Sequence, residues 1–197
     1  MDLLLATRNQ HKTKELRQLL GDDFAVSDLS SYPAIKMLDE SGATFAENAI
    51  LKAVSVSKDR QLQNWFVIAD DSGLEADALG GAPGIYSARY ADKHATDSAN
   101  IEKLVRELKN VAKRSARFRC VIALARAGKV LGTFDGIVEG TIVDLPRGKH
   151  GFGYDPIFQP TGFDETFGEM TSDLKNQISH RAKAIMVLRT ALLAFRN

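Results

Sequence analysis

Two adjacent carboxylates, Asp70 and Asp71, follow a short apolar run at residues 66–69 and lead directly into Ser72-Gly73. Acidic side chains placed directly after a buried strand are costly to desolvate unless they bind something. Magnesium prefers one or two carboxylates with water and substrate phosphates, and a carboxylate can also orient or deprotonate a water. The pattern predicts a metal-binding or water-activating site, and the alternative is a turn with two solvated aspartates.

A further acidic pair, Asp39-Glu40, lies just ahead of a stretch with helical periodicity at residues 43–62. Glu40 could supply a second carboxylate to a metal, or it could be a solvated acid favoured by the helix dipole. Within the predicted helix, Asn48 and Lys52 are four residues apart and therefore share one face.

The segment Thr7-Arg8-Asn9-Gln10-His11-Lys12 lies between a predicted strand and a predicted helix. Backbone N–H groups at the start of a helix attract anions, and the helix dipole adds to this attraction. Asn9 could cap the helix, while Lys12 adds positive charge. The glycine pattern of a Walker A loop is absent. The segment predicts a phosphate site, and the alternative is a plain cap beside solvated lysines.

The run Gly151-Phe152-Gly153-Tyr154-Asp155-Pro156 interleaves glycines with two aromatic residues. Glycines let a backbone approach a ligand closely, and the aromatic rings could stack on a base. The alternative is a tight loop with its aromatics in the core.

Cationic side chains also gather around the start of the last predicted helix, at Lys175 and at Ser179-His180-Arg181. Cations are unfavourable at a helix N-terminus, and a local rule broken in this way often marks function. The alternative is a surface histidine and arginine with no task.

The elements that must position these groups follow from hydrophobic periodicity and turn residues. A hairpin turn is expected at residues 127–129, Thr96 is a plausible N-cap, and Gly21 ends the first helix. Helix-flanked strands early and a hairpin late predict an α/β fold with a mixed sheet. The predicted strands are residues 3–6, 24–26, 66–69, 117–125 and 130–143, and the predicted helices are residues 10–21, 43–62, 96–108 and 179–195.

Composition excludes several classes of protein. The 197 residues carry a net charge of +1, from 26 basic and 25 acidic side chains, whereas duplex-binding proteins usually show a basic excess. The single cysteine, Cys120, lies in an apolar run and is expected to be a core thiol, consistent with a reducing cytoplasm. No run of about 20 apolar residues is present, so no membrane partner is expected.

Six segments, taken in order, closely resemble the inosine/xanthosine triphosphate pyrophosphatase family. The similarity extends over nearly the whole chain, and the segments around Asp70 and Gly80 are its most specific parts. The segments are Leu5-Ala6-Thr7-x-Asn9-x-x-Lys12, Thr44-Phe45-x-Glu47-Asn48-Ala49, Ala69-Asp70-Asp71-Ser72-Gly73-Leu74, Gly80-Gly81-Ala82-Pro83-Gly84-Ile85-Tyr86-Ser87-Ala88-Arg89-Tyr90, Gly151-Phe152-Gly153-Tyr154-Asp155-Pro156 and Ile178-Ser179-His180-Arg181.

The resemblance implies one domain over residues 1–197, with an elongated mixed sheet and two α/β lobes around a central cleft. It also implies a homodimer. The implied reaction is Mg²⁺-dependent hydrolysis of a non-standard purine nucleoside triphosphate, such as ITP, dITP or XTP, to the monophosphate and pyrophosphate. Such an enzyme cleanses the nucleotide pool.

The resemblance also implies roles for individual residues. Asp71 would be the catalytic acidic residue, acting as a metal ligand and as the general base, and Glu40 would be the other metal ligand. The implied supporting residues are Asp70, Glu47, Asn48 and Lys52. The implied substrate-binding residues are Thr7, Asn9 and Lys12 for the triphosphate, Ser72 for a further contact, and Phe152, Gly153, Tyr154, Asp155, Lys175, His180 and Arg181 for the nucleoside.

The sequence departs from the family pattern at two places. Arg8 stands where the family often has a small residue, so it either adds a phosphate contact or points outward. Lys149-His150 replaces a Thr-Gly or Gly-Gly pair before the glycine-aromatic loop.

Three competing functions stay open at this stage. They are a pyrophosphatase of a related fold for modified pyrimidine or methylated nucleotides, a nucleotide-binding regulator without turnover, and a nucleic-acid-binding module.

Overall fold

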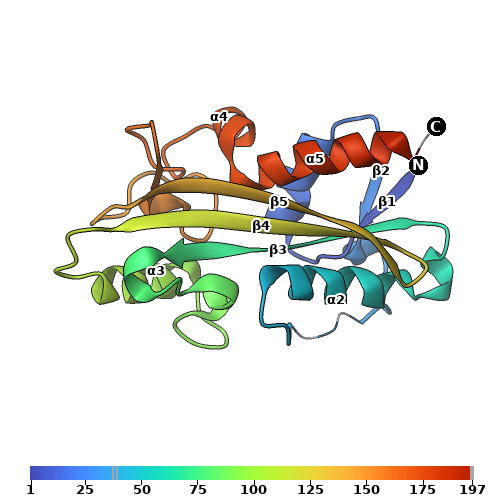
Figure 1. Cartoon of the computed structure of the whole chain (residues 1–197), viewed down its shortest axis with the longest axis horizontal. Coiled ribbons are helices and arrows are strands. Elements are labelled where there is room, and N and C mark those ends of the chain that lie inside the picture. The colour runs from blue at the N-terminus through green and yellow to red at the C-terminus, as the bar shows by residue number, and fades with distance from the viewer. Residues whose placement is uncertain (37, 39, 196–197) are drawn as a thin grey trace. The chain divides into compact units, whose positions relative to one another are not determined.

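The computed structural model describes residues 1–36, 38 and 40–195, so Asp39 lies outside the described residues. Six strands form one mixed sheet in the order β2-β1-β3-β4-β5-β6, which confirms the predicted α/β class (Figure 1). The strands are β1 (Asp2–Leu5), β2 (Ala25–Asp28), β3 (Phe66–Ala76), β4 (Ser115–Arg126), β5 (Lys129–Ile142) and β6 (Phe158–Pro160). The helices are α1 (Gln10–Leu20), α2 (Phe45–Ser57), α3 (Asp97–Glu107), α4 (Ser172–Ile178) and α5 (His180–Ala194).

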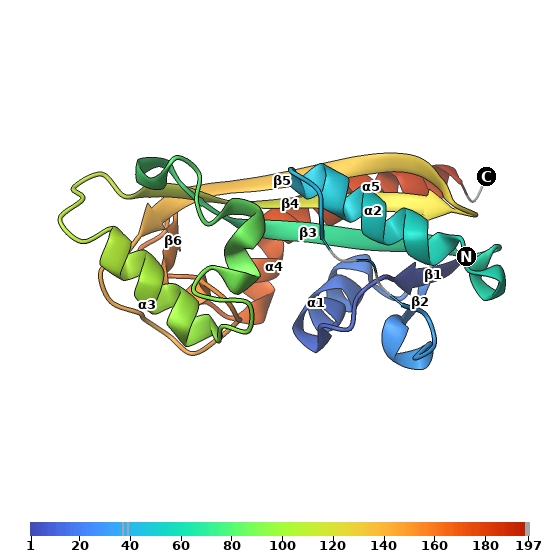
Figure 2. The same cartoon turned by 90° about the horizontal axis from the view of Figure 1, so that it is seen from below.

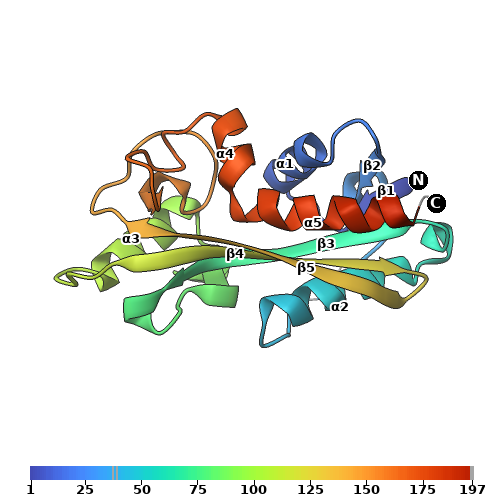
Figure 3. The same ribbon diagram turned by 45° about the horizontal axis from the view of Figure 1, so that its top comes forward.

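Residues 1–71, 120–136 and 181–197 form a first compact unit, called unit 1 here. In unit 1, β1 pairs in parallel with both β2 and β3. Helices α1 and α5 cover one face of its strands and α2 covers the other face (Figure 3). On the α1 and α5 face the buried core includes Leu3, Leu16, Ile68, Cys120 and Leu188.

The strand β3 is longer than predicted. Its predicted end is Ala69, but the strand continues through Asp70 and Asp71 to Ala76. The acidic pair therefore lies within a strand and not after one, because β4 continues beside β3 and keeps it extended past the last β1 partner, Ile68. Successive side chains of a strand point to opposite faces. Asp70 follows Phe66 and Ile68 onto the α1 and α5 face, and Asp71 points to the α2 face.

Residues 72–119 and 137–180 form the second compact unit, called unit 2. Its own core includes Leu74, Leu104, Phe118, Tyr154 and Phe167. Helix α3 starts at the predicted N-cap, where Thr96 Oγ1 accepts a hydrogen bond from Ala99 N at 3.2 Å. Figure 2 shows α3 beside the segments that lead into β6.

Two helix predictions need correction. The predicted helix at residues 43–62 ends at Ser57 and is followed by a separate 3-10 turn, Arg60–Leu62, capped by Asp59. The short helix α4 was not predicted, because seven residues give too little periodicity to recognise. The last helix, predicted to end at Phe195, ends at Ala194, and Phe195 is 49% exposed, whereas Leu188 and Leu192 are buried.

The β4–β5 hairpin gives a stability prediction. Its turn places Ala127 at φ 47° and Gly128 at φ 77°, and left-handed φ is unfavourable for alanine. We expect Ala127→Asn to raise the free energy of unfolding by about 0.5–1 kcal/mol in urea titrations, because asparagine tolerates this backbone conformation. Gly128→Ala is the opposite control, since its new Cβ would lie 2.9 Å from Lys58 Cγ. A less stable Ala127→Asn protein would contradict this account of the turn.

Candidate active site

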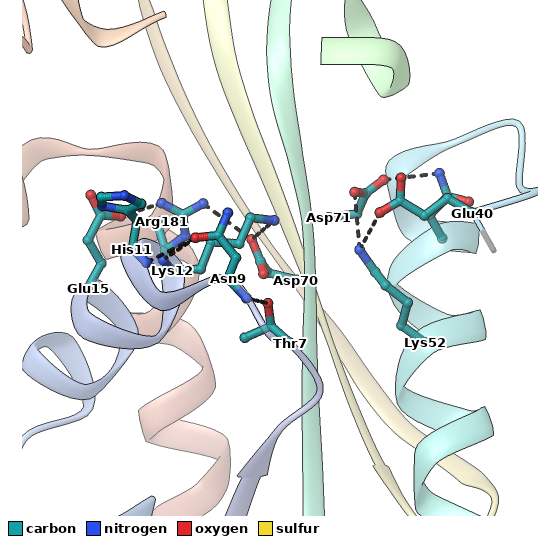
Figure 4. Close-up of polar contacts among 11 residues, drawn as sticks. Thr7, Asn9, His11, Lys12, Glu15, Glu40, Lys52, Asp70, Asp71 and Arg181 are labelled. Atoms are coloured by element: carbon teal, nitrogen blue, oxygen red, sulfur yellow. Dashed lines mark hydrogen bonds and ion pairs between the residues drawn. The ribbon is translucent and has the colours of Figure 1, made fainter. Parts of the chain in front are cut away.

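In unit 1, two carboxylates converge on one buried ammonium group. Lys52 Nζ lies 3.0 Å from Glu40 Oε1 and 3.3 Å from Asp71 Oδ1. Asn48 Nδ2 donates a hydrogen bond to Asp71 Oδ2 at 3.1 Å. Asn48 and Lys52 come from the same face of α2, as their spacing predicts, and both are buried. The structure therefore brings Glu40 and Asp71 together around a cation, although they are 31 positions apart in the sequence (Figure 4).

The loop that carries Glu40 is held by the start of α2. Asn48 Oδ1 accepts a hydrogen bond from Gly42 N at 2.8 Å, so one amide group joins this loop to Asp71. A Cβ on Gly42 would lie 2.7 Å from Glu47 Cβ, so only glycine fits. Thr44 Oγ1 accepts from Glu47 N and Glu47 Oε2 accepts from Ala43 N, an arrangement close to a capping box. Glu47 thus supports the site through the backbone.

The charges in this cluster are strongly coupled. Burial raises the pKa of the Asp71 carboxyl, and the nearby Glu40 adds to this, while Lys52 acts in the opposite direction. Burial alone would lower the pKa of Lys52, but the carboxylates of Asp71, Asp70 and Glu40 outweigh it and raise that pKa. Two acidic groups whose mutual repulsion raises a pKa are a favourable place for additional positive charge.

The chemistry of these donors fits a hard divalent cation. Magnesium is usually held by one or two carboxylates, and water and substrate phosphates complete its octahedron. Glu40 and Asp71 supply that number. Burial raises the Asp71 pKa most, and a cation between the two carboxylates would relieve the repulsion by which Glu40 raises it further. Among the described residues, no group of three or more histidine, cysteine or acidic side chains gathers for a metal, so a closed structural site is not indicated there.

On the other face of β3, Asp70 is the centre of a second network in unit 1. Its carboxylate lies 2.9 Å from Lys12 Nζ and 3.3 Å from Arg181 Nη2, and its side chain is 2% exposed. Arg181 also pairs with Glu15 (Figure 4). The guanidinium is therefore buried between two carboxylates, which explains how a cation can stand at the start of α5 despite the helix dipole.

Asp70 stays ionised because its partners outweigh its burial. Burial by itself would raise the pKa of this carboxyl, but Lys12, Arg181 and Lys52 together hold it far below the usual range. Glu15 was not identified from the sequence. Its spacing could have indicated the role, because Glu15 lies three positions after Lys12 and therefore on the same side of the helix.

The start of α1 is capped as the sequence suggested. Asn9 Oδ1 accepts hydrogen bonds from His11 N at 3.0 Å and Lys12 N at 3.2 Å, and Thr7 Oγ1 accepts one from Asn9 N at 3.1 Å. Three of the N–H groups that could meet an anion are thus already bonded to side chains. Asn9 is exposed and the Lys12 ammonium is partly exposed, so both side chains carry donors that a ligand could reach.

Arg8 has a structural task in this structure. Its guanidinium donates to Leu29 O and Ile35 O, each at 2.8 Å, and so fastens the connection between β2 and α2. Arg8 is exposed, and its contact with phosphate stays a prediction.

In unit 2, the glycine-aromatic loop is organised by Asp155. The Asp155 carboxylate accepts from Phe152 N at 2.9 Å and from Lys175 Nζ at 2.7 Å, and it is buried. The Lys175 ammonium lies 5.2 Å from the centre of the Phe152 ring. A Cβ on Gly151 would come within 1.9 Å of Asp155 Oδ2, so this close approach requires glycine. Three of the predicted nucleoside-binding residues are therefore in direct contact.

Two other predicted nucleoside-binding residues of unit 2, Tyr154 and His180, are core residues. Tyr154 is 3% exposed and its hydroxyl donates to Ser87 O at 2.9 Å, so its ring packs inside and is not free to stack on a base. His180 is buried and stacks on Phe118 with ring centroids 4.7 Å apart, which rules out the surface-histidine alternative. Ser72 is a partly exposed residue of β3.

The Asp70 network gives a pH-dependent stability prediction. Asp70→Asn should lower the free energy of unfolding by about 3 kcal/mol at pH 7, because it leaves Lys12 and Arg181 without this carboxylate. An unfolded aspartate titrates near pH 3.9. Since folding depresses the pKa of Asp70, its contribution is complete above about pH 5 and is lost progressively as pH falls below about 4.

Urea titrations at pH 7, 5, 4 and 3 would measure this difference. The exposed Asp2→Asn variant serves as the control. A difference between wild type and Asp70→Asn that stays constant from pH 7 to pH 3 would show that the carboxylate charge is not the cause.

Comparison with known proteins agrees with the resemblance found in the six motifs. The profile of the Ham1 family matches residues 3–191. A dITP/XTP pyrophosphatase of Bacillus subtilis (strain 168) is 48% identical over 196 residues, which cover 98% of each chain. The solved Ham1 protein of Staphylococcus aureus has a TM-score of 0.87 and 42% identity, covering 98% of this chain and 99% of that one. A HAM1 protein from Coxiella burnetii has a TM-score of 0.88 and 40% identity, again covering 98% of this chain and 99% of that one. With nearly the whole chain matched in both sequence and fold, this protein belongs to the Ham1 family.

Proposed function

We propose that this protein hydrolyses non-standard purine nucleoside triphosphates, namely ITP, dITP and XTP, to the nucleoside monophosphate and pyrophosphate. The observation that carries the proposal is the convergence of Glu40 and Asp71 on one buried cation, Lys52. Relatives named dITP/XTP pyrophosphatase, at 45–48% identity over nearly the full chain, support the choice of substrate.

Glu40 and Asp71 would hold Mg²⁺. When bound, that ion would neutralise phosphate charge and lower the pKa of a coordinated water. The carboxylate of Asp71 would orient the attacking water and accept its proton, a task helped by a raised pKa. Lys52 keeps both carboxylates in place, and Asn48 fixes the orientation of Asp71.

The triphosphate would be bound at the start of α1. Lys12 and the Asn9 amide nitrogen are donors there, Thr7 supports Asn9, and the helix dipole favours negative charge. Phosphoryl transfer asks a protein mainly for positioning and charge stabilisation. Asp70 provides the positioning, since it holds the Lys12 ammonium at 2.9 Å.

The nucleoside would be bound by the unit 2 loop. The partly exposed Phe152 ring offers a stacking surface, and Lys175 is a hydrogen-bond donor suited to the 6-oxo group of hypoxanthine and xanthine. Adenine carries a 6-amino donor at that position and would be rejected. Gly153, Ser72, His180 and Arg181 remain predicted contacts, and Tyr154 would act from the core.

We further propose a cytoplasmic homodimer that does not bind nucleic acid or membranes. The near-neutral charge argues against binding to nucleic acid. Within the described part of the chain, every helix is too short or too polar to cross a bilayer.

Replacing the proposed base tests the mechanism. We expect Asp71→Asn to lower kcat for ITP by about 10³-fold or more, because the carboxylate that activates water and holds the metal is lost. Pyrophosphate release with and without Mg²⁺ is the measurement, and the exposed Asp22→Asn variant is the control. A folded Asp71→Asn enzyme with near wild-type turnover would refute the assignment.

A substrate panel tests the base preference. Purified protein with Mg²⁺ should release pyrophosphate from ITP, dITP and XTP with kcat/KM at least about 10²-fold above that for ATP and GTP, because mismatched polar groups in a site are costly. Equal kcat/KM values for all five nucleotides would refute a function in removing non-standard nucleotides from the pool. Binding without any pyrophosphate release would favour a regulatory protein instead.

A further inference from the structure

The specific run at residues 80–90 has no role in the proposed chemistry, yet it is joined to the nucleoside loop. Ser87 O accepts the hydrogen bond from the Tyr154 hydroxyl at 2.9 Å. The Ser87 hydroxyl accepts from Leu74 N at 2.9 Å and donates to Gly84 O at 2.6 Å, so the segment is fixed to β3. The run thus forms a rigid support behind the loop.

Helix α3 holds the same support from its other end. Asn100 is 3% exposed, and its side chain accepts from Ala91 N at 2.8 Å and donates to Ala88 O at 3.3 Å. Both contacts are to the backbone that directly follows Ser87. The position of α3 relative to the residue 84–91 segment is therefore determined by a buried side chain.

One turn earlier on α3, Asp97 reaches the loop itself. Its Oδ2 accepts a hydrogen bond from Gly153 N at 2.7 Å, across 56 positions of sequence. Capping the helix does not require this carboxylate, because Thr96 already accepts the Ala99 N–H. A charged acceptor at this distance makes a stronger bond than a neutral one.

The glycine-aromatic loop is held both by hydrogen bonds within it and by contacts with other segments of unit 2. Asp155 folds the loop on itself through Phe152 N, which sets its internal shape. The orientation of the loop depends on its contacts with the rest of unit 2. Side chains connect it to Lys175, to Ser87 through Tyr154, and to Asp97 through Gly153. The backbone also connects it to Gly168, whose N–H donates to Asp155 O at 2.9 Å. Gly153 has φ 60°, a conformation glycine leaves easily, so an external acceptor is needed to hold it.

We propose that Asp97 is a positioning residue for nucleoside binding, acting through Gly153 to hold Phe152 and Asp155 in the orientation that receives the base. The inference rests on the proposed function, because it assigns the residue 151–155 loop to the nucleoside. Asp97 itself does not touch the substrate. Its loss should weaken binding of the base without affecting binding of phosphate.

The test compares Asp97→Ala with wild type on ligands that have or lack a base. We expect KM for ITP and the calorimetric Kd for IMP to rise about 10-fold, with kcat within about 2-fold, which corresponds to the loss of one charge-assisted hydrogen bond. The inhibition constant of inorganic tripolyphosphate, which has no base, should not change. Asp97→Asn keeps an acceptor oxygen and should restore most of the affinity.

Two further variants separate positioning from general damage. Glu102→Ala removes an exposed acid from the same helix. It should leave the KM for ITP, the Kd for IMP and the inhibition constant of tripolyphosphate unchanged. Tyr154→Phe removes only the hydroxyl that bonds Ser87 O and should give the same pattern as Asp97→Ala.

Three outcomes would overturn the inference: an unchanged Kd for IMP in Asp97→Ala, an equal loss for IMP and tripolyphosphate, or no IMP binding by the wild type. Absent pyrophosphate release from wild type would instead refute the proposed function. The IMP measurement does not depend on turnover and still decides the role of Asp97.

Discussion

The alternation of side chains along β3 is the constraint on which unit 1 depends. Because Asp70 and Asp71 are consecutive residues of an extended strand, their carboxylates leave opposite faces of the sheet. One meets Lys12 and Arg181, and the other meets Lys52 and Asn48. A turn at this point would let both face the same way, so the continuation of the strand gives two adjacent aspartates separate tasks.

The electrostatic consequences of the two environments differ. Asp70 has cations on several sides and stays ionised despite complete burial. Burial raises the pKa of Asp71, and the facing carboxylate of Glu40 adds to this. A permanently charged residue is suited to holding Lys12 and Arg181 in place. A residue whose charge is less favourable is suited to accepting a proton and binding a cation. Burial is similar for the two, so their neighbours account for the difference.

Unit 2 is organised by contacts between polar side chains and backbone groups. The glycine-aromatic loop has little regular structure, and its shape comes from bonds made by Asp155, Tyr154 and Asp97. Such a loop can present the partly exposed ring of Phe152 while Tyr154 and Asp155 stay buried. The run around Ser87 belongs to this scaffold, because Ser87 bonds to β3 and to Tyr154.

The sequence by itself determined what depends on local chemistry: the mixed α/β class, the caps at Asn9 and Thr96, the shared face of Asn48 and Lys52, and the core position of Cys120. It also supplied the family, through motifs in order. Only the tertiary structure decided that β3 continues through the acidic pair, because strand length there depends on β4, which lies 44 or more residues further along the chain. The partnerships of Arg181 with Glu15, of Arg8 with Ile35 and of Asp97 with Gly153 likewise join residues distant in sequence. Periodicity shows which face a side chain occupies, but the packing of separate segments selects the group it meets.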